Sequence, residues 1–419
     1  MENRSNYRKF LLLWSGEFVS SVGSGLTSFG LSVYVFQQTG SAASMALVAL
    51  IAFLPVLLLG PLAGVLADRY DRCKLMMVGD GMSALGLIYI LICMFSGRAE
   101  LYKICIGVFI SAVFSSLLEP AYRAVVTDML TKDEYSKAGG MMSIAGSARY
   151  LISPLLAGLL LTVSDVRLLI IIDTCTFVLT VFCIASVRNS RVTHQRGETE
   201  PFVKSFKEGW KAITQKRGIF VLIIVSSVIT CFMGAIQILV EPMILDFQTS
   251  KVLGIAETVC ACGMLVSSVI IGIVGLKKNF TRKLSISLTV CGLAMIGFGA
   301  RENIYVICGF GFLFFFMLPF ANNCLDYLTR INIDADKQGR AWGLISFLSQ
   351  LGYVFAYALA GQFADKIAEA GNIGVGRGAA IVIMISGAML ALSAMMLSGF
   401  KSVKELEKGD KNVKETDSK

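Results

Sequence analysis

The sequence predicts an all-α integral membrane protein with about twelve transmembrane helices, and two observations carry this prediction. The 419 residues are 55% hydrophobic and only 16% charged, with a mean hydropathy of +0.70. A chain of this composition has too few polar side chains to cover a soluble domain. The charges are also unevenly spread, because long runs such as Phe18 to Ala67 contain no Lys, Arg, Asp or Glu.

The individual helices follow from the lengths of these runs. A spanning helix needs about 20 mostly apolar residues, since about 30 Å of hydrocarbon is crossed at about 1.5 Å per residue. The first run is too long for one span and divides at Gln37 to Ser41. The predicted helices lie near residues 10–37, 43–67, 74–97, 101–125, 138–163, 166–187, 218–244, 251–276, 282–300, 303–328, 339–365 and 376–400.

The cations predict the orientation of these helices. With a cytoplasmic amino terminus, 30 of the 38 Lys and Arg residues fall in cytoplasmic segments, as the positive-inside rule requires. We therefore expect a multi-pass protein of the cell (plasma) membrane with both termini in the cytoplasm. The net charge of +9 is then a topology signal and does not indicate a nucleic-acid partner.

The longest polar interruption divides the chain into two halves of six helices. The predicted units are an N-terminal half (1–187), a cytoplasmic linker (188–217), a C-terminal half (218–400) and a disordered cytoplasmic tail (401–419). In the linker, Phe202, Phe206 and Trp210 recur every four residues, which favours an amphipathic helix on the inner membrane surface. A solvated connector is the alternative.

The loop between the second and third predicted helices carries the most informative motif. It reads GVLADRYDRCK from Gly64 to Lys74 and resembles the G-x-L-A-D-R-x-G-R-K signature of the major facilitator superfamily. The signature belongs at this place in the chain. The matching residues are Gly64, Leu66, Ala67, Asp68, Arg69, Arg72 and Lys74. Asp71 departs from the pattern, which has Gly there.

This resemblance implies the major facilitator fold, with two six-helix halves around a central cavity. It also implies that Asp68 and Arg72 act as a conformational latch, pairing across the cytoplasmic helix ends and separating when the transporter changes state. Charges at helix ends exchange modest energies, which suits such a switch. The predicted latch residues are Gly64, Asp68, Arg69, Arg72, Asp128 and Arg340. A plain solvated loop is the alternative.

Two further segments extend the resemblance. In the fifth helix, Gly146, Pro154 and Gly158 resemble a degraded antiporter motif, although small residues and Pro also serve simple helix packing. Ser20 to Ala42, together with the Gly64 loop, is similar to the macrolide-efflux-like branch of drug:proton antiporters, which also contains siderophore exporters.

Ionisable side chains inside the spans are costly and are therefore functional candidates. The proton-coupling candidates are Glu17, Glu119, Arg149 and Asp173. Arg149 falls deep in the fifth helix and needs a carboxylate partner or water. We hypothesise that it pairs with Glu17 or Glu119 in a proton-responsive centre; a permanent ion pair that fixes packing is the alternative.

The predicted function is proton-coupled efflux of a small amphiphilic organic compound, macrolide-like or siderophore-like, by alternating access. Uptake of a small nutrient and a non-transporting sensor are the alternatives. An enzyme is not expected, because the chain has one His and no nucleotide-binding loop. We expect no cofactor, no metal and no nucleic acid, and a monomer whose partners are the lipid bilayer, a small organic substrate and protons.

Overall fold

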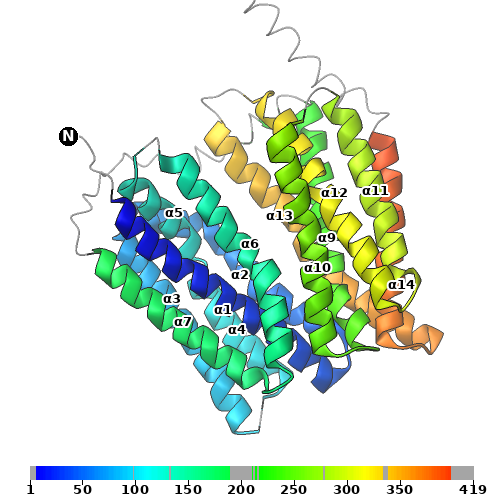
Figure 1. Cartoon of the computed structure of the whole chain (residues 1–419), viewed down its shortest axis with the longest axis horizontal. Helices are drawn as coiled ribbons and strands as arrows, with labels where there is room; N and C mark the ends of the chain where they lie inside the picture. The colour runs from blue at the N-terminus through cyan, green and yellow to red at the C-terminus, as the bar shows by residue number, and fades with distance from the viewer. Residues whose placement is uncertain are drawn as a thin grey trace, which may run out of the picture. The chain divides into compact units, whose positions relative to one another are not determined.

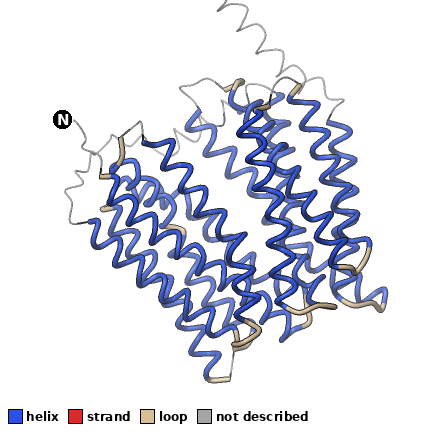
Figure 2. The backbone as a smooth tube through the Cα atoms, in the orientation of Figure 1, coloured by secondary structure: helices blue, strands red, loops and turns tan. Residues whose placement is uncertain are grey.

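A computed structural model describes residues 6–97, 99–131, 134–188, 210, 213–214, 217–276, 279–333 and 338–397. Within these ranges it is built of α-helices without strands (Figures 1 and 2). Twelve helical segments are long and apolar enough to cross a membrane. The predicted fold class is confirmed, with boundaries within a few residues of those expected.

The chain divides into two compact units. The first comprises Met1–Thr199 with Gln248–Thr258, and the second comprises Glu200–Phe247 with Val259–Lys419. The helices up to residue 188 are α1 (Tyr7–Thr39), α2 (Ala42–Arg69), α3 (Arg72–Phe95), α4 (Leu101–Ser115), α5 (Leu118–Met129), α6 (Tyr135–Leu160) and α7 (Val166–Arg188). Those that follow are α9 (Arg217–Leu245), α10 (Ser250–Val274), α11 (Phe280–Ala300), α12 (Ile304–Arg330), α13 (Gln338–Gly371) and α14 (Val375–Leu397). The predicted amphipathic segment of the linker falls mostly outside the described residues, and the predicted tail falls entirely outside them.

The fourth predicted span is broken into α4 and α5 around Ser116 and Leu117. Pro120 explains the break, since it lacks an N–H and its ring clashes with the carbonyl four residues earlier, that of Ser116. Glu119, Arg123 and Asp128 all lie on α5, after this break.

Local capping explains where several helices begin and end. Gly40 ends α1 with a left-handed φ of 60° and returns its N–H to the Phe36 carbonyl at 2.7 Å. The Ser41 hydroxyl then caps α2 by accepting a hydrogen bond from the Ser44 N–H at 3.1 Å. Gly40 and Ser41 thus make the turn that was predicted at the Gln37 to Ser41 division.

The first unit has two buried apolar clusters with acidic and hydroxyl side chains between them. Along α3, Met76 belongs to one cluster and Ala84 to the other. Asp80 and Ser83 lie between these positions and are 1% and 0% exposed. The polar layer is therefore enclosed by packed apolar residues at both ends.

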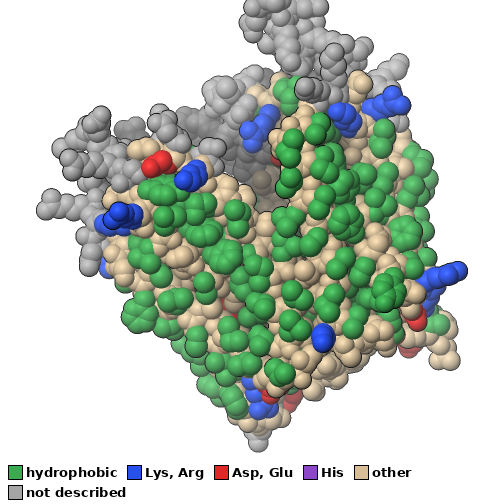
Figure 3. Space-filling model, in the orientation of Figure 1, with side chains coloured by type: hydrophobic (Ala, Val, Ile, Leu, Met, Phe, Trp, Pro, Cys, Tyr) green, Lys and Arg blue, Asp and Glu red, His purple; other side chains and the backbone are tan. Residues whose placement is uncertain are grey.

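The outer surface is that of a protein immersed in lipid. Large apolar side chains such as Phe182, Ile273 and Tyr305 are exposed over 67%, 81% and 84% of their surfaces. Figure 3 shows a face covered mainly by hydrophobic and uncharged side chains, with most of its charged ones toward the ends of the helices. Exposure on this scale would favour aggregation in water, and it matches contact with hydrocarbon.

Candidate functional site

The loop that carries the Gly64 motif is a two-residue connection between α2 and α3. Asp71 caps α3 by accepting a hydrogen bond from the Lys74 N–H at 3.2 Å. Its other oxygen accepts a hydrogen bond from Arg188 Nε at 3.1 Å, which ties the start of α3 to the end of α7. Asp71, which stands where the signature has Gly, thus has two contacts that Gly could not make.

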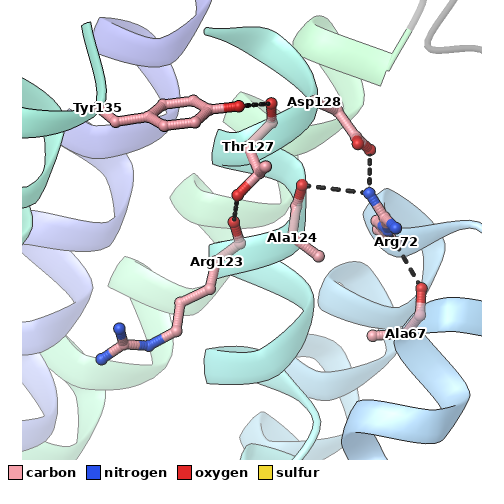
Figure 4. Close-up of polar contacts among 7 residues, drawn as sticks. All are labelled: Ala67, Arg72, Arg123, Ala124, Thr127, Asp128 and Tyr135. Atoms are coloured by element: carbon pink, nitrogen blue, oxygen red, sulfur yellow. Dashed lines mark hydrogen bonds and ion pairs between the residues drawn. The ribbon is translucent and has the colours of Figure 1, made fainter. Parts of the chain in front are cut away.

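Arg72 is the centre of a second network, shown in Figure 4. Its guanidinium forms an ion pair with Asp128 on α5, and the two side chains are only 18% and 25% exposed. Arg72 also donates to the Ala67 carbonyl at 3.1 Å and to the Ala124 carbonyl at 3.2 Å. The planar guanidinium can reach three oxygens at once, so it joins α2, α3 and α5 in a way that Lys could not.

The other predicted latch residues lie on the surface, or their side chains lie outside the part of the chain that the structure describes. Asp68 and Arg69 are exposed at the end of α2. A side-chain atom added at Gly64 would meet nothing within 4 Å. Arg340 lies in the first turn of α13, but its side chain lies outside the described residues. The structure therefore brings Arg72 and Asp128 together. That Asp68 pairs across the cytoplasmic helix ends stays a prediction.

The hypothesised pairing of Arg149 with Glu17 or Glu119 is not found among the described residues. Glu119 instead binds Arg123, one turn further along α5, with Arg123 Nη2 2.7 Å from Glu119 Oε1. A partner four residues away on the same helix is always within reach, so it is engaged without any tertiary contact. Arg149 is exposed on α6, and the acid on which its charge acts is Asp173.

Three carboxyl groups converge inside the first unit. Asp173 on α7 is 2% exposed and accepts hydrogen bonds from the hydroxyls of Ser24 at 3.3 Å and Thr176 at 3.4 Å. Asp80 on α3 is within electrostatic range of both Asp173 and Glu17 of α1. One oxygen of Asp80 and one of Glu17 are buried without a hydrogen-bond partner among the described residues. Such groups are functional candidates, because unpaired buried oxygens are costly.

Asp80 is the residue that sequence reasoning missed. It stands just before the charge-free run that begins at Gly81 and lies inside the helix predicted over residues 74–97, but it was not among the proton-coupling candidates. Its position eight residues after the start of α3 was the available signal, since eight residues of helix place it roughly 12 Å from the helix end.

The antiporter-like motif of α6 forms close helix contacts within the first unit. A Cβ at Gly158 would lie 2.7 Å from the Ser250 carbonyl oxygen and 3.4 Å from the Gly254 Cα, so this crossing needs glycine. Next to Pro154, Ser153 donates to the Val22 carbonyl of α1 at 3.0 Å. A Cβ at Gly146 would meet nothing within 4 Å. Gly158 therefore has a packing role that Gly146 does not share.

Twelve apolar spans, two compact units and charged networks at helix ends and inside the bundle define a polytopic membrane transporter. The family model "Major Facilitator Superfamily" matches residues 13–357, and the chain belongs to that superfamily.

Relatives and solved structures agree with this assignment. The chain is 26% identical to macrolide efflux protein A of Streptococcus pyogenes over 375 residues, which are 88% of this chain and 92% of that protein. It is 22% identical to the staphyloferrin A transporter of Staphylococcus aureus, over 68% of this chain and 72% of that one. A bacterial homologue of the iron transporter ferroportin, in an inward-facing state, matches with a TM-score of 0.74 at 14% identity, covering 95% of this chain and 100% of that one.

Proposed function

We propose that the chain exports a small amphiphilic organic compound from the cytoplasm in exchange for protons, by alternating access. The protein is a multi-pass membrane transporter that acts on small molecules, and the direction, the coupling ion and the cytoplasmic position of both termini are the proposed parts. Export is supported by the efflux relatives, which align over most of the chain. A siderophore-like cargo is supported only by the more distant staphyloferrin A transporter.

The observation that carries proton coupling is the set of buried carboxyl groups in the first unit. An ionised carboxylate without a partner is costly inside a membrane, so such a group exchanges its proton when a conformational change brings water or a cation to it. Glu17 and Asp80 have the unpartnered oxygens, whereas Asp173 is held by hydroxyl groups. The ionisable groups around them are Tyr122 on α5, Arg149 on α6 and Cys183 on α7. We propose that Glu17 and Asp80 carry the exchanged proton.

We propose that the Arg72–Asp128 network acts as a cytoplasmic gate in the same transport cycle. It joins three helix ends of the first unit in a single arrangement, and it would break and re-form when these ends move relative to one another during transport. Its two carbonyl contacts hold the guanidinium in place. The gate would therefore respond as a unit, not as three separate bonds.

The direction is tested by accumulation of radiolabelled erythromycin in bacteria that lack their own macrolide pumps. We expect lower accumulation with the protein present and recovery when a protonophore is added. Higher accumulation would mean uptake. No change across macrolides and siderophores, with the protein verified in the membrane, would favour a sensor.

The coupling ion is tested in inverted vesicles with an acidic interior. We expect them to concentrate erythromycin and to release it when nigericin collapses the pH gradient. Concentration that follows a sodium gradient and ignores pH would contradict proton exchange. Vesicles with Glu302→Gln, an exposed acid in the loop before α12, serve as the control.

A further inference from the structure

The second unit contains a polar cavity that the proposed cycle does not use. Its volume is about 200 Å³, and it lies between α9, α12 and α13. Six of its ten lining residues are polar, which is unusual inside a bundle of apolar helices. These six are Ser226, Asp326, Thr329, Ser346, Ser349 and Gln350. Polar and ionisable groups within apolar helices are functional candidates, because they are costly to bury.

The cavity has hydrogen-bonding capacity that the protein itself leaves unused. Ser349 is 7% exposed, and its hydroxyl oxygen is buried with no hydrogen-bond partner among the described residues. Thr329, by contrast, already donates to the Leu325 carbonyl at 2.8 Å. A buried hydroxyl without a hydrogen-bond partner is destabilising, so a ligand that accepts from it or donates to it would recover that energy.

The charge of the cavity is negative. Asp326 is the one ionisable residue among those that line it, and the structure gives it no ion pair within the described residues. Arg330, one turn further along α12, is not part of the lining, although its positive charge acts on Asp326. A carboxylate, four hydroxyls and an amide carbonyl together form an acceptor set that suits an ammonium group.

We propose that this cavity binds the protonated amine of the transported compound, with Asp326 as its counter-ion and Ser349 and Gln350 as hydrogen-bonding partners. The inference rests on the proposed function and narrows its substrate class. Pockets for whole drug-sized ligands occupy about 300–1,000 Å³, so a cavity of this size takes one substituent, such as an amino sugar. A polycarboxylate siderophore would be repelled by Asp326.

The test compares a basic and a neutral form of one compound. Erythromycin carries a dimethylamino sugar that is protonated at neutral pH, and its N-demethyl, N-acetyl derivative keeps the ring system without the charge. Binding of both is measured on purified full-length protein in lipid nanodiscs. We expect Asp326→Asn to weaken erythromycin binding about tenfold or more, because a charge-assisted contact is lost, and to leave the neutral derivative within about twofold.

Two further variants sharpen the measurement. Ser349→Ala removes the unused hydroxyl and should weaken erythromycin binding about two- to fivefold. Glu302→Gln removes a carboxylate from an exposed loop of the same unit and should change neither affinity. Equal weakening of both compounds by Asp326→Asn, or no weakening of either, would overturn the proposal.

The wild-type protein supplies a result that does not depend on the folding of any variant. It should bind erythromycin at least about tenfold more tightly than the neutral derivative. Equal affinity for the two compounds overturns the amine site, even if cells export both. Charge-dependent binding without export would instead overturn the proposed function and leave the amine site standing.

Discussion

The two units of the molecule differ in where they keep their charges. In the first unit, Asp80 and Asp173 are fully buried, and Glu17 has a buried, unpartnered oxygen. The fully buried polar side chains described in the second unit are hydroxyls and the Asn332 amide. Its carboxylate of interest, Asp326, is exposed to a cavity.

We infer from this difference that the two units have different roles in transport. Carboxyl groups enclosed by apolar clusters can hold a proton that water reaches only in some conformations. A carboxylate open to a cavity stays hydrated and can exchange its water for a ligand cation. We infer that the first unit serves coupling and gating and that the second unit contributes to recognition.

The largest effect should follow from breaking the gate of the first unit. Arg72→Ala leaves Asp128 without its ion pair and two carbonyls without their donor. Loss of one partner of such a shielded pair should cost about 2–4 kcal/mol. We expect initial rates of erythromycin efflux to fall at least tenfold. The matched control is Arg8→Ala, whose exposed side chain lies in the first turn of α1. An equal loss of efflux in both variants would show that the Arg72 network is not a gate.

The next effect concerns helix packing around the buried acids. A Cβ at Gly23 would lie 2.5 Å from Thr176 Oγ1 and 2.8 Å from Asp173 Oδ1, so Gly23→Ala must displace these side chains or separate α1 from α7. Overpacking of this kind should lower the free energy of unfolding by about 1–3 kcal/mol. It would be measured as a lower midpoint temperature of thermal unfolding in detergent. Gly309→Ala in α12 of the second unit meets nothing within 4 Å and should be neutral or slightly stabilising. The same shift in both would mean that the crossing of α1 and α7 is not tightly packed.

The third prediction separates transport from coupling. Asp80→Asn keeps the shape of the side chain but cannot release a proton. We expect gradient-driven accumulation of erythromycin in inverted vesicles to fall about tenfold while downhill exchange persists. The pH dependence of wild-type accumulation, which should rise as the vesicle interior becomes more acidic, should flatten in this variant. An unchanged pH dependence of accumulation in this variant would show that Asp80 does not carry the exchanged proton.

The sequence determined the spans well and the site only in part. Charge-free runs located twelve helices, because a chain that crosses the hydrocarbon must satisfy its backbone hydrogen bonds internally and an apolar helix does so. The Arg72–Asp128 contact was anticipated through the family signature. The partner of Glu119 was missed because Arg123, on the same helix, is closer than any tertiary partner. The cavity around Asp326 needs three helices to be brought together, and no local pattern reports that.

The smallest expected effect is at the residue where the loop departs from its signature. Asp71→Gly restores the common pattern and removes both the cap of α3 and the ion pair with Arg188. Gly is itself a tolerated cap, so that change costs only a few tenths of a kcal/mol. The ion pair joins side chains that are 36% and 41% exposed, which adds about 0.2–1 kcal/mol. We therefore expect the free energy of unfolding to fall by about 1 kcal/mol or less. The rate of efflux should stay within about twofold of wild type. A loss as large as that of Arg72→Ala would show that Asp71 belongs to the gate, because its contact with α7 would then have to break and reform during transport.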